Sequence, residues 1–419
     1  MNVEQHRIDP NTAGPEGPSR SIAQAEFIAV VALITAMGAL SIDTILPAFP
    51  EIRSHLGLAA DSTRVSLLVT AYLLGMGLGQ IPAGIISDRF GRKRTLSAFV
   101  VLYMLGVVGT MAAPSLPLMV LARIVWGLGG SGPRVVAIAM VRDSHEGVRM
   151  AQVLSYVQSI FVIVPVLAPS LGAIALHAGG WRTTVAVPAG IAVVLVVWML
   201  RIPETLPHAR RRAVRLSAIR TAFAQVIRHR PTALYALAMA FLFGCISSYI
   251  SLAETIIDEV YDRKSAFPII FGFIAASMGV STLVNARLVG RLGLDRMLTR
   301  MPPVAVALAV GLAGISLTKN GRPPFLIFAV GMALLLSAQT LITPNVSTQA
   351  MTPHGDLAGM AAGVTGTIST IGGAVFGTVV SQVHDGSTRT LTTAIAVFLA
   401  AATVLIASAR RLESGRTIT

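Results

Sequence analysis

Residues 84–94, Gly-Ile-Ile-Ser-Asp-Arg-Phe-Gly-Arg-Lys-Arg, form a short basic segment between two apolar runs. The run before it, 63–87, and the run after it, 96–113, are each close to the roughly 20 apolar residues that a membrane-spanning helix needs. Runs of this size recur along the chain, in which 54% of the 419 residues are hydrophobic and only 12% are charged. This composition excludes a soluble protein and predicts an all-α membrane protein.

The apolar runs predict twelve transmembrane helices in two bundles of six. The first six are 24–47, 63–87, 96–113, 117–141, 150–176 and 182–201, and the second six are 231–256, 266–287, 300–317, 323–345, 356–383 and 389–408. The domain organisation is therefore an N-terminal bundle at 24–201, a cytoplasmic central loop at 202–230 and a C-terminal bundle at 231–408. Residues 1–23 are expected to form a disordered cytoplasmic tail, and residues 409–419 a second cytoplasmic tail.

The basic segment has a counterpart in the second half of the chain. Arg-Phe-Gly-Arg-Lys-Arg-Thr-Leu at 89–96 is matched by Arg-Leu-Gly-Leu-Asp-Arg-Met-Leu at 291–298. Both copies follow the second predicted span of their half, as is typical of transporters built from two repeated halves. In such proteins the substrate site lies at the interface between the halves.

The basic residues predict how the chain is oriented. With the N-terminus inside, the tails and inner loops hold about 23 of the 33 lysine and arginine residues, and the outer loops about eight. Both termini are therefore expected to be cytoplasmic, and the net charge of +14 reflects membrane topology rather than nucleic-acid binding. The densest basic cluster lies in the central loop, where it would face anionic headgroups: Arg210, Arg211, Arg212, Arg215, Arg220, Arg228 and Arg230.

Nothing in the composition points to an enzyme. Cys245 is the only cysteine and lies in an apolar run, so neither an intrachain disulfide nor a cysteine-based metal site is expected. We expect no cofactor, a proton gradient as the energy source, and a monomer that contacts a small-molecule substrate, protons and lipid. Arginine greatly outnumbers lysine, which is typical of GC-rich bacterial genomes and favours the inner (plasma) membrane of a bacterium as its location.

The clearest charges inside predicted spans are three, and each costs roughly 2.5–3.5 kcal/mol there unless it is paired, hydrated or functional. Asp43 lies about 28 Å along its helix from the cytoplasmic side, and Arg123 about 27 Å. Because these depths match, Asp43 is a candidate for loading and releasing the coupling proton, with Arg123 tuning it. The alternative interpretation is a fixed ion pair that only stabilises the bundle.

The third charge, Arg134, follows Arg123 by three helical turns plus about 20°, so the two side chains point to one face. We expect this face to line a central cavity. The cavity wall is further predicted to include polar residues of other spans: Tyr72, Tyr249, Gln339 and Asn345. Glu254 lies near the outer end of its span, where an ordinary interfacial charge is the simpler interpretation.

The fifth span carries Pro165, Pro169 and Gly172. Each proline removes a backbone donor and leaves a carbonyl to be satisfied by neighbouring groups, so we predict a kink in this helix. A kink suits a helix that moves during transport, although kinks also occur in static bundles.

The segment 84–93 resembles the signature Gly-x-x-x-Asp-Arg-x-Gly-Arg-Lys of the major facilitator superfamily, which lies between the second and third helices, and every signature residue is present. The resemblance implies the major facilitator fold, which alternates between inward-open and outward-open states. It also implies that Gly84 lets the second helix approach the eleventh and that Asp88 caps and pairs there. Arg89, Arg92 and Lys93 would hold a cytoplasmic gate shut in one state, and Gly91 completes this gate motif. Such charge pairs are expected to form only when the two halves meet.

Other segments resemble the drug:proton antiporters, specifically the bicyclomycin and chloramphenicol resistance group. Among them are Leu-Ser-Ile-Asp-Thr-Ile-Leu-Pro-Ala-Phe-Pro at 40–50, Arg-Ile-Val-Trp-Gly at 123–127, Val-Arg-Asp at 141–143 and Pro-Glu-Thr-Leu at 203–206. The resemblance implies proton-coupled export of small, hydrophobic, drug-like molecules. Trp126 departs from the family, which usually has glutamine at this position.

Two other functions remain open at the level of sequence. A proton-coupled importer of a small metabolite on the same fold would fit the charges and their depths equally well, and only the family resemblance favours export. A non-transporting membrane receptor is disfavoured, because the chain has no sensor or effector domain and keeps the complete gate signature.

Overall fold

The computed structural model describes residues 24–145, 147–199, 201–207 and 216–414, and within these the chain is helical, without strands. The described part contains the twelve expected long helices: α1 (Gln24–Asp43), α3 (Leu67–Phe90), α4 (Arg92–Ala112), α5 (Leu116–Ser144), α6 (Gly147–Gly179), α7 (Trp181–Met199), α9 (Arg230–Thr255), α10 (Phe267–Leu292), α11 (Leu294–Thr318), α12 (Phe325–Met351), α13 (Ala358–Gln382) and α14 (Thr388–Ser414). Eleven helical segments are long and apolar enough to cross a membrane, and a further apolar stretch, Ile163–Gly179, lies in α6. The predicted fold class is confirmed.

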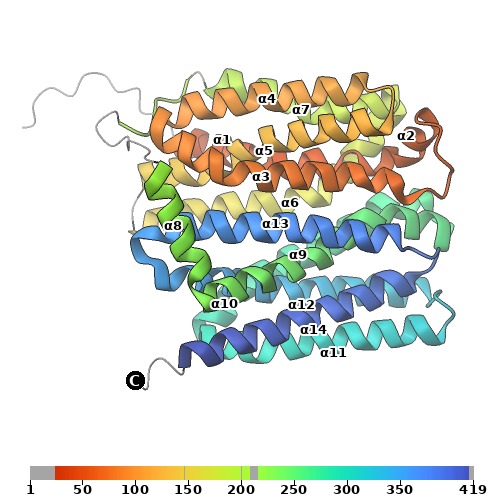
Figure 1. Ribbon diagram of the computed structural model, residues 1–419. Coiled ribbons are helices and arrows are strands. Elements are labelled where there is room, and N and C mark those ends of the chain that lie inside the picture. Colours follow the sequence, from red (N-terminus) through yellow and green to blue (C-terminus); the bar gives the residue numbers. More distant parts are fainter. Residues whose placement is uncertain (1–23, 146, 200, 208–215, 415–419) are drawn as a thin grey trace, which may run out of the picture.

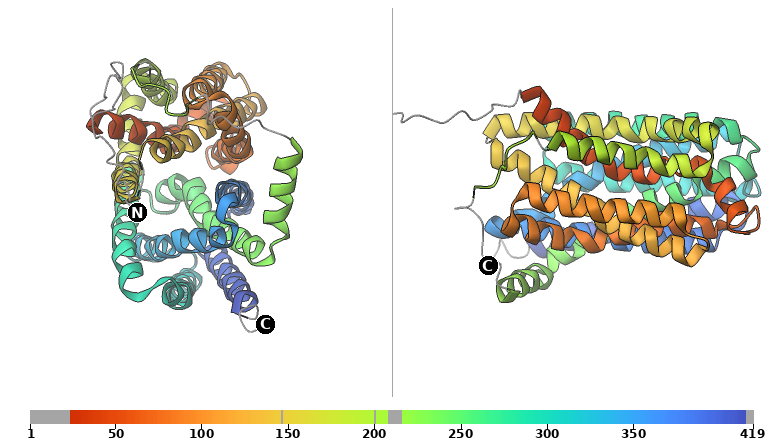
Figure 2. Two further views of the ribbon diagram at one scale, coloured as in Figure 1. Left: turned by 90° about the vertical axis from the view of Figure 1, so that its left-hand side faces the viewer. Right: turned by 90° about the horizontal axis from the view of Figure 1, so that it is seen from above.

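The long helices run side by side and form two groups (Figures 1 and 2). Within the first group α5 packs against α3 and α4, and α1 packs against α6; within the second, α9 packs against α13 and α14. The groups meet where α3 contacts α13 and where α6 contacts α10. Both ends of the described chain and α8 (Leu216–Arg228) lie at one end of the bundle, called here the terminal end, and α2 (Phe49–His55) lies at the other, the α2 end (Figure 1).

The internal repeat corresponds to two matching turns. Gly91 joins α3 to α4 with φ 95°, and Gly293 joins α10 to α11 with φ 80°. A residue with a Cβ is strained at these dihedral angles, whereas glycine adopts them readily. Each half therefore uses a glycine to reverse the chain after its second spanning helix.

The first spanning helix is interrupted beside Asp43, which is the last residue of α1. Pro47 lies in a single 3-10 turn, Leu46–Ala48, and Pro50 lies in the first turn of α2. Proline cannot donate the backbone hydrogen bond that would continue α1. The predicted span 24–47 is thus a helix that ends at Asp43, followed by a turn and a short second helix.

The interrupted segment is held by α6. A Cβ on Gly172 would lie 2.2 Å from the carbonyl oxygen of Thr44, so the absence of a side chain lets α6 approach the backbone directly after Asp43. Pro165 and Pro169 lie inside α6, which continues through both. The predicted kink stays a prediction.

Two predicted boundaries differ from the structure. Residues 202–230 are not all loop, because α8 forms within them and its buried Val226 packs against Ala361 and Val364 of α13. The expected tail at 409–419 is helical as far as Ser414, where Glu413 accepts a hydrogen bond from Tyr235. The predicted tail at 1–23 and the arginines at 210–215 lie outside the described residues.

We expect Gly91→Ala and Gly293→Ala each to destabilise the protein by about 1–3 kcal/mol, because alanine is strained at these positive φ values. Gly290→Ala is the matched control, since it lies in regular α10 with open space around it and no positive φ. Thermal unfolding of the purified variants measures the difference. Equal unfolding temperatures for all three variants would contradict the assignment of these turns.

Candidate functional site

Asp43 is the carboxylate buried deepest in the first bundle, with 4% of its surface exposed. Within the described residues its side chain forms no hydrogen bond and no ion pair. The hydroxyl of Tyr249, on α9 of the other bundle, lies within electrostatic reach of it and has no hydrogen-bond partner either. A lone buried carboxylate facing an unused hydroxyl is a site that can bind a proton or a ligand group.

Arg123 is fully buried on α5 and is fixed to the first bundle by backbone contacts. Its Nε donates to the carbonyl oxygen of Leu68 at 3.0 Å, and its Nη1 donates to that of Ser41 at 3.0 Å. Its Nη2 has no hydrogen-bond partner among the described residues. Arg123 thus ties α5 to α1 and α3, and its contact on α1 is Ser41, two residues before Asp43. One of its nitrogen donors, Nη2, stays unused within the described part of the chain.

The guanidinium of Arg123 is covered by aromatic rings. It lies 4.6 Å from the ring centre of Trp126 and 5.1 Å from that of Tyr72. Trp126 in turn packs edge-on against Tyr103, whose hydroxyl is 2.6 Å from the Ser41 hydroxyl. Trp126 therefore stabilises the buried cation through its π face, where a glutamine would have offered a polar contact.

The structure does not join Asp43 and Arg123 by an ion pair. None of the ion pairs between described residues involves either side chain. The fixed ion pair considered as the alternative interpretation is therefore not formed in this conformation. Arg123 instead uses Nε and Nη1 for the carbonyls of Leu68 and Ser41.

Arg134 is exposed on α5 and lies within electrostatic reach of Tyr72, as Arg123 does. Because an arginine facing hydrocarbon would be costly, we predict that the exposed part of Arg134 meets water in an internal cavity. Gln339 and Asn345 instead connect helices of the second bundle. Gln339 Nε2 donates to the carbonyl oxygen of Leu242, and Asn345 Nδ2 donates to Asn285 Oδ1. Their assignment to the cavity wall stays a prediction.

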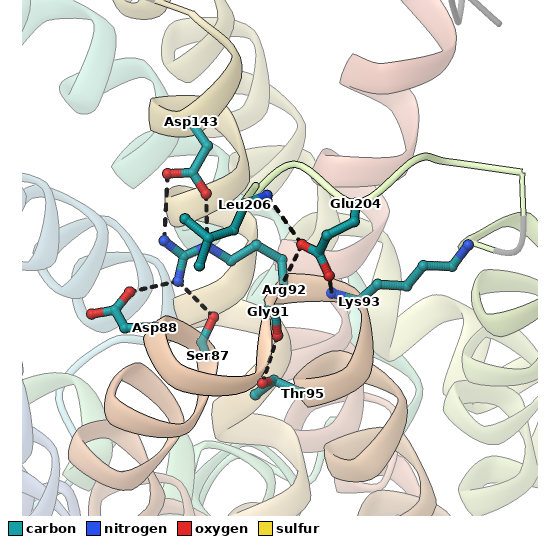
Figure 3. A network of polar contacts seen from close by, with 9 residues as sticks. All are labelled: Ser87, Asp88, Gly91, Arg92, Lys93, Thr95, Asp143, Glu204 and Leu206. Atoms are coloured by element: carbon teal, nitrogen blue, oxygen red, sulfur yellow. Dashed lines mark hydrogen bonds and ion pairs between the residues drawn. The ribbon is translucent and has the colours of Figure 1, made fainter. Parts of the chain in front are cut away.

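The signature residues form a compact network around Arg92, which is 4% exposed (Figure 3). Arg92 Nη1 lies 2.6 Å from Asp88 Oδ1 and 2.8 Å from Ser87 Oγ, and Arg92 Nε lies 2.7 Å from Asp143 Oδ2. Two carboxylates and a hydroxyl thus share one guanidinium at the junction of α3, α4 and α5.

Glu204 caps the first turn of α4 (Figure 3). Its carboxylate accepts from the backbone N–H groups of Arg92 at 2.9 Å and Lys93 at 3.2 Å. A carboxylate at a helix N-terminus satisfies free donors and interacts favourably with the helix dipole. Asp143 and Glu204 belong to family-like segments of the sequence, but their spacing from residue 92 gave no sign that they converge there.

The network differs from the expected gate in one respect. Arg92, Asp88, Asp143 and Glu204 all belong to the first half of the chain, so these charge pairs form without the second bundle. Gly84 likewise faces α5, since a Cβ there would lie 3.8 Å from Val135 and no atom of α13 lies within 4 Å of it. Arg89 is exposed and lies over the ring of Phe90.

Polar contacts between the bundles begin at the α2 end and stop at mid-height. They join α3 and its preceding turn to α13: Ser66 with Ser381 at 2.7 Å, Thr70 with Thr378 at 2.7 Å, the Gly77 carbonyl with Thr367 at 3.1 Å, and Gln80 with Thr370 at 3.2 Å. Among the described residues none lies nearer to the terminal end. Among the described residues, the polar contacts between the bundles are therefore confined to the α2 end and mid-height, while nearer the terminal end Ile81 makes apolar contact with α13.

The strongest contact between the bundles is an ion pair that the sequence did not predict. Arg53 of α2 donates to both carboxylate oxygens of Glu254 on α9, at 3.0 and 3.3 Å, and the two side chains are 4% and 6% exposed. Removing one partner of such a buried pair costs about 3–5 kcal/mol. The interfacial role expected for Glu254 is wrong, because its charge is buried between the bundles.

Comparison with known proteins identifies the family to which this fold belongs. Residues 31–377 match the sequence profile described as Major Facilitator Superfamily. The chain belongs to this superfamily. Its fold matches the crystal structure of a D-xylose-proton symporter with a TM-score of 0.75 at 14% identity, over 91% of this chain and 97% of the other.

Among relatives within the superfamily, a bicyclomycin resistance protein homolog of Haemophilus influenzae is 24% identical over 359 residues, covering 85% of this chain and 89% of its own. The multidrug resistance protein MdtL of Klebsiella pneumoniae is 33% identical over 171 residues, or 40% of this chain and 43% of its own. This major facilitator protein is thus a multi-pass membrane transporter and not an enzyme, and its relatives support the resemblance to the drug:proton antiporters.

We expect Asp143→Asn to destabilise this major facilitator protein by about 1–3 kcal/mol, because the buried Arg92 loses a charged acceptor. Asp295→Asn is the matched control, since Asp295 is 87% exposed and pairs with Arg410 on the surface; there the loss should stay below about 1 kcal/mol. Thermal unfolding of both variants measures the difference in stability. Equal losses of stability would show that burial of the Arg92 network does not add to the free energy of unfolding.

Proposed function

We propose that this transporter exports small, hydrophobic, drug-like molecules in exchange for protons across the inner membrane of a bacterium. The observation that carries the proposal is the isolated, buried carboxyl group of Asp43 at the break in α1, facing a hydroxyl of the opposite bundle. Secondary transporters often place their coupling ions at interrupted helices. The relatives named for bicyclomycin and multidrug resistance support export of drugs.

The terminal end is assigned to the cytoplasm. The exposed arginines there, such as Arg89, Arg94, Arg228 and Arg296, agree with the positive-inside rule. Because the bundles are joined at the α2 end and, among the described residues, share no polar contact near the terminal end, this conformation is an inward-facing one. Arg134 would then face water that enters from the cytoplasm.

Asp43 carries the coupling proton in this proposal. An ionised carboxylate without a partner is unfavourable in a buried apolar site, so Asp43 is protonated in this conformation. When the proton leaves toward the cytoplasm, the spare Nη2 donor of Arg123 can stabilise the carboxylate, and a drug can enter the cavity. After the bundles rock, a proton from outside neutralises Asp43 again and the drug is released.

We predict that Asp43→Asn abolishes drug-coupled proton flux, because an amide keeps the shape of the side chain but cannot exchange a proton. The assay uses everted vesicles with an imposed pH gradient and bicyclomycin as the probe. Arg123→Ala should impair flux to a similar degree. A wild-type rate in Asp43→Asn would make Asp43 a structural residue and overturn the proposal.

Asp385→Asn serves as the control carboxylate in this assay. Asp385 lies in the loop between α13 and α14. Partial burial acts to raise its pKa, but hydrogen bonds from Ser387 and Thr390 outweigh burial and hold the pKa of Asp385 below its usual value. The group therefore stays ionised at neutral pH, and its replacement should leave the flux unchanged.

The cavity electrostatics predict a substrate preference. Arg123 and Arg134 are two positive charges near one acid, so the cavity should disfavour permanent cations and favour oxygen-rich neutral or anionic molecules. Arg134→Ser should raise resistance to tetraphenylphosphonium and lower resistance to bicyclomycin in a host that lacks its own pumps. An unchanged ratio of resistance to the two compounds would contradict this preference and would mean that Arg134 only anchors water or packs against its neighbours.

A further inference from the structure

The ion pair at the α2 end has the geometry of a latch between the two bundles. Arg53 is fixed to the first bundle, because its Nε donates to the carbonyl oxygen of Ser62 at 3.0 Å. Its Nη2 donates to Glu254 and also to the hydroxyl of Thr255 at 3.1 Å. The same guanidinium thus bonds the first bundle at one edge and α9 of the second bundle at the other.

Glu254 is fixed in turn by its own bundle. The Thr255 hydroxyl lies 3.4 Å from Glu254 Oε2 and completes a small network with Arg53. A π-helical turn, Ile256–Val260, follows directly and changes the direction in which the next carboxylates point. Such turns are rare and occur often at functional sites.

Carboxylates surround this single guanidinium. Asp258 lies within electrostatic reach of Glu254, and Glu259 lies within reach of Glu254, Arg53 and Asp61. Arg53 attracts both glutamates, whereas Asp258 repels both and Asp61 repels Glu259. Glu259 is exposed and Asp258 is half-buried, which gives a chain of carboxylates from the surface to the buried Glu254.

We propose that Glu254 is a second proton-binding group and that its protonation from outside releases Arg53 and opens the α2 end of the transporter. Protonation removes the buried negative charge that holds Arg53 across the interface, while Arg53 keeps its bond to Ser62. The hydrogen bonds that remain between the bundles at this end, from Arg53 to the Thr255 hydroxyl and between pairs of hydroxyls, contain no ion pair. Glu259 of the second bundle still attracts Arg53, but it is exposed, so water screens this attraction. The inference rests on the proposed proton-driven export and on the orientation that it assigns.

This role differs from that of Asp43. Asp43 exchanges its proton within the central cavity, whereas Glu254 binds a proton at the outer rim and controls the opening of that rim. External acid, which drives export, would itself favour the outward-open state. The sign follows from the ion pair, because only the ionised form of Glu254 holds the bundles together at the α2 end.

The test measures the separation of the bundles directly. Spin labels are placed at Ala60 and Ser265, which are exposed at the α2 end of different halves, in a Cys245→Ser background that removes the buried sole cysteine. Distances are measured in lipid nanodiscs without substrate between about pH 8 and about pH 5. The wild type should be closed at the higher pH and populate the longer distance as the pH falls.

Three variants separate the latch from general electrostatics. Glu254→Gln should lower the ratio of closed to open states at least about tenfold at high pH and abolish the pH response. Glu259→Gln should keep the response but move its midpoint to lower pH, because loss of a neighbouring negative charge weakens proton binding by Glu254. Glu51→Gln is the matched control, since Glu51 lies on α2 but bonds Trp181 within its own bundle, and it should behave as the wild type does.

Either of two results would overturn the latch: a closed, pH-responsive Glu254→Gln, or a wild type whose distances do not change with pH. The exchanged pair Arg53→Glu with Glu254→Arg guards against a folding defect, because it should restore the closed state. If the distances show no latch while Asp43→Asn still abolishes flux, the proposed export by proton exchange is supported and the proposed role of Glu254 is rejected. If the distances respond to pH as expected but Asp43→Asn transports normally, the role of Asp43 in coupling is rejected and the role of Glu254 is supported.

Discussion

The structure depends on one constraint, which is that a charge inside a lipid bilayer must be paired, stacked or hydrated. Of the five charged residues that are buried in the described part of the chain, four satisfy it with partners. Arg123 uses two carbonyls and two aromatic rings, and Arg92 uses two carboxylates and a hydroxyl. Arg53 and Glu254 use each other across the bundle interface. Asp43 alone has no partner among the described residues, which singles it out as the group that changes its charge.

The two ends of the molecule differ in how their charges are arranged. At the terminal end the Arg92 network is complete within the first bundle, so it can fold and persist while the bundles move. At the α2 end the Arg53–Glu254 pair crosses the interface, so it exists only while that end is closed. The Arg92 network therefore stabilises one bundle by itself, whereas the Arg53–Glu254 ion pair must break when the α2 end opens. Alternating access uses both kinds of contact, because each bundle moves as a unit and the contacts between the bundles change.

The sequence predicted the helices and the signature segment well, because spans and positive-inside loops follow from composition alone. It did not predict contacts between residues far apart in the chain. Nothing in the local sequence marks Asp143 and Glu204 as partners of residues 92 and 93. The prediction for Glu254 was wrong because its position along α9 suggested the membrane–water interface, whereas α2 covers it in the fold. The break at Asp43 was visible in principle, since Pro47 and Pro50 follow within seven residues.

In the proposed mechanism, Asp43 is protonated in the inward-facing state and gives up its proton when a drug binds. Proton release is measured with a pH-sensitive dye in weakly buffered, purified protein, on titration with a drug that the vesicle assay shows to be transported. The wild type should release protons as the drug saturates it, and Asp43→Asn should bind the same drug without releasing any. Drug binding to the wild type without proton release, or equal release from both proteins, would contradict this mechanism.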